Sequence, residues 1–146
     1  MDRLSNVGIW FNRILLLLVS ILFVMISTKY LFNPLASAAE SNIVLSSATA
    51  LSVARVSMGA IPLAIAVITF ITIFSQKQII GGLYIVFVLT FTVTLVRIIS
   101  LRIDGPSAFG QKVLLPEITI TVLSAIGLYL ELRRRTKSKK ADLSIN

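Results

Sequence analysis

The chain has 146 residues, of which 56% are apolar and 14% charged, and its formal net charge is +8 at pH 7. Soluble domains carry roughly a quarter charged residues, so this composition excludes an ordinary water-soluble globular protein. The sequence contains no cysteine and no histidine. This excludes disulfides, zinc sites, haem ligation through histidine, and Ser-His or Cys-His nucleophile pairs. We therefore expect a non-enzymatic protein with neither cofactor nor metal.

Long apolar stretches dominate the chain, at about 14–32, 48–74, 79–101 and 113–132. Each has about twenty residues or more, which as a helix is enough to cross a hydrocarbon core of about 30 Å. We predict an all-α integral membrane four-helix bundle over residues 1–132, followed by a basic tail over 133–146. The length allows one domain.

The first stretch raises the question of a cleaved signal peptide. Arg3 and Arg13 precede it, and Ala36-Ser37-Ala38 resembles a signal-peptidase site. The apolar run extends to Phe32, however, and is longer than the core of a signal peptide. We expect this helix to be retained, with Asn33-Pro34 opening a loop after it.

Turn residues separate the remaining stretches. A short polar segment at 75–78 predicts an antiparallel hairpin of the second and third helices, and Pro62 is expected to kink the second. Asp104-Gly105-Pro106 predicts a loop before the fourth helix, where Glu117 follows Pro116. A carboxylate in the first turn of that helix would be favoured by the helix dipole.

The distribution of lysine and arginine predicts the orientation. The N-terminus, the loop at Lys77 and the tail carry two, one and six of these residues, nine in all, against Lys29, Arg102 and Lys112 on the other side. By the positive-inside rule, both termini are cytoplasmic. The tail cations suit a membrane-surface anchor on anionic lipid rather than a nucleic-acid site: Arg133, Arg134, Arg135, Lys137, Lys139 and Lys140.

Two arginines lie inside apolar stretches, where charges are rare and usually face the bundle interior or water. Arg55 and Arg97 are each twenty-one residues from Gln76 (76 − 55 and 97 − 76). We therefore expect both at one level, about 30 Å from the cytoplasmic side. Glu117 is expected slightly deeper and Asp104 just above. We expect the three helices to face one another here, with Gly59 on the same face as Arg55.

Several interpretations of this predicted cluster of Arg55, Gly59, Arg97, Asp104 and Glu117 remain open. In the first, an Arg–Glu117 pair only locks the helices of an accessory component of a larger membrane complex. In the second, the cluster binds an anionic lipid headgroup or small metabolite from outside the membrane. In the third, Glu117 is the acid or base of a membrane enzyme.

Short motifs within 48–132 resemble the DUF4345 family of small bacterial four-helix membrane proteins. They are 54–60 (ARVSMGA), 96–106 (VRIISLRIDGP) and Pro116-Glu117. The family pattern has paired glycines after the first arginine, and here Met58 replaces the first of them. The resemblance implies the four-helix fold, and we expect a location in the bacterial inner membrane. It implies no activity, substrate or cofactor.

Overall fold

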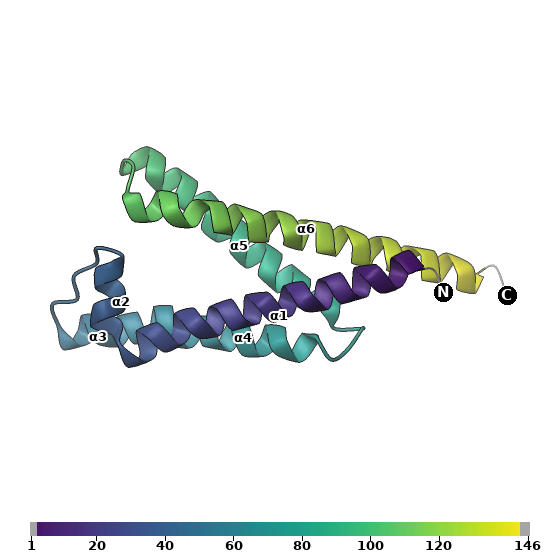
Figure 1. The fold of residues 1–146 in the computed structure, drawn as a ribbon, viewed down its shortest axis with the longest axis horizontal. Coiled ribbons are helices and arrows are strands. Elements are labelled where there is room, and N and C mark those ends of the chain that lie inside the picture. The colour runs from purple at the N-terminus through teal and green to yellow at the C-terminus, as the bar shows by residue number, and fades with distance from the viewer. Residues whose placement is uncertain (1–2, 144–146) are drawn as a thin grey trace.

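The computed structural model describes residues 3–143, with side chains described for 7–137, and this part of the chain is helical throughout apart from its connections (Figure 1). The elements in chain order are α1 (Arg3–Phe32), α2 (Pro34–Glu40), α3 (Ala48–Ala54), the π-helix η1 (Arg55–Ala60), α4 (Ile61–Thr72), α5 (Ile79–Ile103) and α6 (Ala108–Leu143).

The structure confirms the prediction of long apolar helices. Four stretches are long and apolar enough to cross a membrane: Val7–Phe32, Ala48–Thr72, Ile79–Ile103 and Ala108–Lys137. The second of these consists of α3, η1 and α4 in series. The last helix is longer than its predicted apolar stretch, since α6 begins at Ala108 and continues through the basic tail to Leu143. No glycine or proline follows Gly127 in α6 to interrupt it, and lysine and arginine are good helix formers.

The helices are arranged as two pairs that diverge from one another. The segment η1–α4 packs on α1, and α5 packs along α6. Figure 1 shows that α1 begins and α6 ends at one end of the molecule, which we call the terminal end and which also holds the α4–α5 turn. At the opposite end, called the loop end, α2 and α3 lie well apart from the α5–α6 connection.

The hydrophobic core joins α1, α5 and α6 in the half of the molecule nearer the terminal end. Its most deeply buried members, Leu16, Ile79, Leu83 and Val86, are all 0% exposed. Two glycines let the backbones approach here. A Cβ on Gly82 would lie 3.1 Å from Thr72 Cβ and 3.3 Å from Leu16 Cδ1, and one on Gly127 would lie 2.7 Å from Asn12 Oδ1.

A buried carboxylate, that of Glu131, organises the contacts between α6 and the α4–α5 turn at the terminal end. Glu131 is 1% exposed and accepts hydrogen bonds from Arg134 Nε and Nη2 at 3.0 and 2.7 Å and from Arg135 Nε at 2.9 Å. Arg135 also donates from Nη2 to the carbonyl oxygens of Gln76 and Lys77 at 3.0 and 2.9 Å. These bonds connect α6 to the α4–α5 turn. We call the set of Glu131, Arg134 and Arg135 the Glu131 clamp.

The clamp divides the basic tail into two groups of cations. Arg134 and Arg135 face Glu131, whereas Arg133 and Lys137 are exposed. The side chains of Lys139 and Lys140 lie outside the described residues. The membrane-surface anchor thus stays a prediction. The exposed charges of Arg133 and Lys137 are compatible with it.

The helix adapts to Pro62 through the wider turn of η1, which directly precedes α4. Proline has no N–H to donate and its ring collides with the carbonyl one turn earlier, so the preceding backbone must adjust. Here the N–H of Ile61 donates to the oxygen of Val56, five residues back. The carbonyl oxygen of Gly59 accepts a bond from Ser27 Oγ of α1 at 2.6 Å.

We expect Glu131→Gln to destabilise the protein by about 2–3 kcal/mol, because it leaves two clamped arginines without their counter-charge. The measurement is the thermal unfolding midpoint in detergent micelles, which should fall by several degrees. Glu40→Gln is the matched control, since Glu40 pairs with Lys29 at 3.2 Å but both side chains are more than half exposed. Such a pair contributes under about 1 kcal/mol. Equal shifts of the unfolding midpoint for the two variants would contradict the stabilising role of the Glu131 clamp.

Neighbouring glycines in α5 give a second test. Gly82→Ala should lower the unfolding midpoint, because the new methyl group would press on Thr72 and Leu16. Gly81→Ala should leave it unchanged or raise it, since nothing lies within 4 Å of a Cβ there and alanine favours helix by about 1 kcal/mol. A midpoint lowered as much by Gly81→Ala as by Gly82→Ala would refute this packing.

Candidate functional site

An ion pair joins α5 and α6 toward the loop end. Arg97 donates from Nε to Glu117 Oε2 and from Nη2 to Glu117 Oε1, both at 2.7 Å. The two side chains are 26% and 19% exposed. One turn away, the hydroxyl oxygens of Thr94 and Thr121 lie 3.4 Å apart. This parallel two-bond geometry is the strongest arrangement of a guanidinium and a carboxylate.

The pair confirms that Glu117 has an arginine partner but corrects the expected role of the helix dipole. Because α6 begins at Ala108, Glu117 lies nine residues inside the helix (117 − 108), beyond the first turn. The start of α6 is capped by Ser107, whose Oγ accepts a bond from the N–H of Gly110 at 3.0 Å. Pro116 lies inside the helix. Glu117 is therefore held by Arg97.

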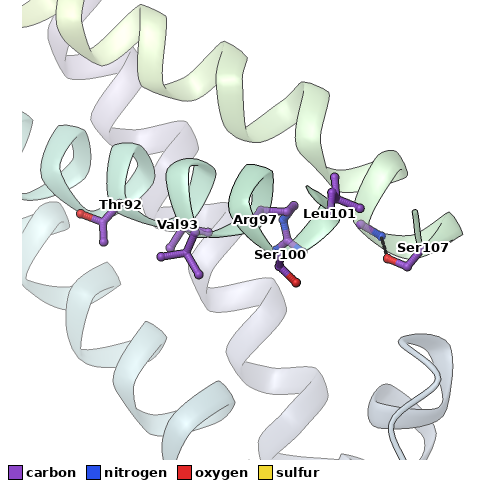
Figure 2. A pocket seen from close by; sticks show the side chains of 8 residues that line it. Thr92, Val93, Arg97, Ser100, Leu101 and Ser107 are labelled. Atoms are coloured by element: carbon purple, nitrogen blue, oxygen red, sulfur yellow. Dashed lines mark hydrogen bonds between the residues drawn. The ribbon is translucent and has the colours of Figure 1, made fainter. Parts of the chain in front are cut away.

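A groove of about 340 Å³ runs along α5 beside this pair and ends at the first residues of α6. Figure 2 shows Thr92, Val93 and Ser100 projecting from the side of α5 that is turned away from α6, with Ser107 at the far end. The groove is lined by Thr92, Val93, Val96, Arg97, Ser100, Leu101, Ser107 and Gly110. Its part nearer the terminal end is mainly apolar, and Arg97, Ser100 and Ser107 supply the polar groups toward the loop end. We call it the α5 groove.

The charged side chains around the α5 groove do not give it a net positive charge. The charge of Arg97 is offset by Glu117. The Cζ atom of Arg97 also lies 5.9 Å from the centroid of the Phe109 ring, close enough for a cation–π contact. Ser100 donates from Oγ to Asp104 Oδ2 at 2.7 Å, which places a second carboxylate next to the groove. A strongly anionic ligand is therefore not favoured here.

The structure brings together only part of the predicted cluster. Arg97 and Glu117 meet, and Asp104 lies near them through Ser100. Arg55 is exposed on η1, and residues 7–137 provide it with no ion-pair or hydrogen-bonding partner. Gly59 faces α1, where a Cβ would lie 2.9 Å from Leu31 Cδ2. The expected meeting of three helix faces thus occurs only between α5 and α6, because the π-helical segment is packed on α1 instead.

Nothing in the described residues resembles a metal centre, since no group of three or more Asp or Glu side chains gathers within them.

The sequence analysis missed the role of Glu131, although the sequence contains a pattern that indicates it. A glutamate followed by arginines three and four residues later lies on one helix face with both of them. The lining of the α5 groove carried no comparable signal.

We expect Arg97→Gln and Glu117→Gln each to lower the free energy of unfolding by about 1–2 kcal/mol. The double variant should lose little more than either single variant, because each substitution already removes the same pair of bonds. Thermal unfolding of the three variants in one detergent measures this. Additive losses would show that the two side chains stabilise the protein independently.

Comparison with known proteins supports the resemblance seen in the sequence. The model of a domain of unknown function, DUF4345, matches residues 11–128, from within α1 to within α6. The match therefore includes the first helix, which the short motifs did not cover. No curated protein and no solved structure shows a significant match. The chain belongs to the DUF4345 family.

Proposed function

We propose that this protein is a non-enzymatic multi-pass protein of the bacterial inner membrane that holds a lipid-like amphiphile in the α5 groove. The observation that carries the proposal is the groove itself, whose lining is mainly apolar around Val93 and Val96 and gains the polar groups of Arg97, Ser100 and Ser107 toward the start of α6. An amphiphile has the same division, with an acyl chain for the apolar part and a headgroup for the polar end.

The proposed membrane orientation follows from helix length and charge. Four helices are long and apolar enough to span the bilayer. The nine cations near the termini and the α4–α5 turn favour a cytoplasmic terminal end. Figure 1 is consistent with this, since α1 begins and α6 ends on the side of the α4–α5 turn. The polar end of the groove then lies near the outer surface of the membrane, where headgroups are found.

The dimensions and surroundings of the groove suit such a ligand. A volume of about 340 Å³ falls within the range of about 300–1,000 Å³ typical of small-molecule pockets. Val93 and Val96 offer apolar contact, and the hydroxyl groups of Ser100 and Ser107 offer hydrogen bonds. Because Glu117 and Asp104 balance the local positive charge, we favour a headgroup with hydroxyl or ester oxygens over a free anion.

The support for a non-enzymatic role comes from Glu117. Both of its carboxylate oxygens accept bonds from Arg97. A general acid or base needs a carboxyl group free to exchange a proton with a ligand, and this geometry opposes that role.

An accessory role in a larger membrane complex is the second candidate function. It is favoured by the divergence of the two helix pairs toward the loop end (Figure 1), where apolar side chains such as Val53, Val56 and Ile103 are exposed among the described residues. In lipid, helices associate through close packing and interhelical hydrogen bonds. A protein that filled this space would bury those side chains as well as the α5 groove.

We expect Val96→Trp to remove the bound amphiphile, because the larger side chain occupies the groove. Native mass spectrometry after gentle detergent extraction should show one retained lipid fewer than in the unmodified protein. Val88→Trp is the matched control, since Val88 lies on α5, is 56% exposed compared with 58% for Val96, and does not line the groove.

Identical lipid content in the unmodified protein and in both variants would refute the amphiphile-binding role. A protein that copurifies in stoichiometric amount with Val88→Trp but not with Val96→Trp would instead support the accessory role.

A further inference from the structure

Arg55 is a charged residue within an apolar membrane-spanning segment. It opens η1 and is the eighth residue of the 25-residue span Ala48–Thr72. A helix of that length is about 37 Å long, some 7 Å longer than the hydrocarbon core. With the excess shared between the two ends, the backbone of Arg55 lies about 7 Å inside the outer boundary of the core.

The carboxylates of the described side chains all have other partners. Glu40 pairs with Lys29, Glu117 with Arg97, and Glu131 with Arg134 and Arg135. Asp104 accepts from Ser100. Arg55 is exposed on the surface of η1 rather than enclosed by the helices. No carboxylate of the described side chains is therefore available to Arg55 as a counter-ion within the membrane.

The surface around Arg55 offers a second polar group and apolar contact. Ser52 is three residues earlier and so lies on the same helix face, one turn nearer the loop end. It is exposed, and its hydroxyl makes no hydrogen bond with residues 7–137. Val53 and Val56 beside them are 59% and 56% exposed. The surface thus combines a guanidinium, a free hydroxyl and apolar side chains.

We propose that Arg55 and Ser52 bind the phosphate group of a phospholipid in the outer leaflet. A guanidinium presents parallel N–H donors that match phosphate oxygens, and a long arginine side chain extends toward the interface from a backbone buried a short way inside. The acyl chains of the same lipid then lie along Val53 and Val56. This inference rests on the membrane orientation proposed above but is independent of the α5 groove.

A phospholipid suits this position better than a carboxylate from a partner protein. Arg55 is within reach of the layer in which lipid phosphates are concentrated, and the apolar side chains of Val53, Val56 and Met58 beside it are exposed to the acyl chains of such a lipid. The one glycine of η1, Gly59, is buried against α1 and offers no close approach to a partner helix.

The test uses the full-length protein in nanodiscs that contain equal amounts of phosphatidylglycerol and a diglycosyl diacylglycerol, which has no phosphate. Native mass spectrometry counts the lipids that remain after mild release. We expect the unmodified protein to retain phosphatidylglycerol in preference to the glycolipid. Arg55→Gln should lower the retained phosphatidylglycerol about tenfold, the effect of losing a charged hydrogen-bonded contact. Arg55→Lys should lower it less.

Arg102→Gln is the control, because Arg102 is also an exposed arginine toward the loop end but belongs to the last turn of α5. It should leave lipid retention unchanged. The unfolding midpoint of each variant shows whether that variant is folded. We expect Arg55→Gln and Arg55→Lys to be folded, because the side chain of Arg55 is exposed.

Equal retention by the unmodified protein and Arg55→Gln would overturn the proposal, as would an equal effect of Arg102→Gln. A copurifying protein that is lost with Arg55→Gln while lipid retention stays constant would overturn it in favour of a carboxylate partner. Val96→Trp distinguishes the two proposed sites. If it alone removes a lipid, the groove proposal stands and the phosphate proposal fails, and if Arg55→Gln alone does so, the reverse holds.

Discussion

The main physical constraint on this chain is that an ion inside an apolar membrane layer needs a counter-ion. Several of the charged side chains in the helical spans obtain one within the chain. Arg97 meets Glu117 across α5 and α6, and Glu131 meets two arginines of its own helix. Each pair satisfies charges that would cost several kcal/mol if left alone in hydrocarbon. Arg55 has no such partner among the described side chains, and its position near a boundary makes an external one accessible.

These pairs also explain how the helices are held together. The Glu131 clamp reaches the carbonyl groups of the α4–α5 turn and so joins the two helix pairs at the terminal end. The core residues of α1, α5 and α6 lie in the same half of the molecule. Toward the loop end, Arg97 and Glu117 join α5 only to α6, and Ser27 joins α1 only to η1. The divergence of the pairs therefore follows from where the polar contacts lie.

Much of this fold could be predicted from the sequence. Apolar length alone identified the four spans, and turn residues placed connections at Asn33-Pro34, 75–78 and Asp104-Gly105-Pro106. The loop expected after Asn33-Pro34 contains the short helix α2, because proline is favourable in the first turn of a helix. That Glu117 meets an arginine was also predictable, because helical distances from the turns place Arg55, Arg97 and Glu117 near one level of the membrane. These distances did not choose between Arg55 and Arg97. Family membership followed from short motifs around the same residues. These successes depend on rise per residue and on charge, which are local quantities.

The lateral arrangement of the helices could not be obtained in the same way. Distance along a helix gives the depth of Arg55 but not the direction of its side chain, and the one-residue widening at η1 changes that direction. Gly59 was expected beside Arg55 and faces α1 instead, because Ser27 and Leu31 are packed on it. The Glu131 clamp was missed because the cations after the fourth span were assigned together to the membrane surface.

The π-helical geometry of η1 has a consequence for how the chain can change by insertion and deletion. A turn with five-residue hydrogen bonds holds one more residue than the α-helical turn it replaces. Removing one residue from 55–60 would let an α-helical turn replace it while the flanking helices keep nearly the same rotation, since the two turns cover the same angle. Removing two residues would rotate α3 by about 100° relative to α4. This segment can therefore lose a single residue without reorienting the helices on either side, which a regular helix cannot.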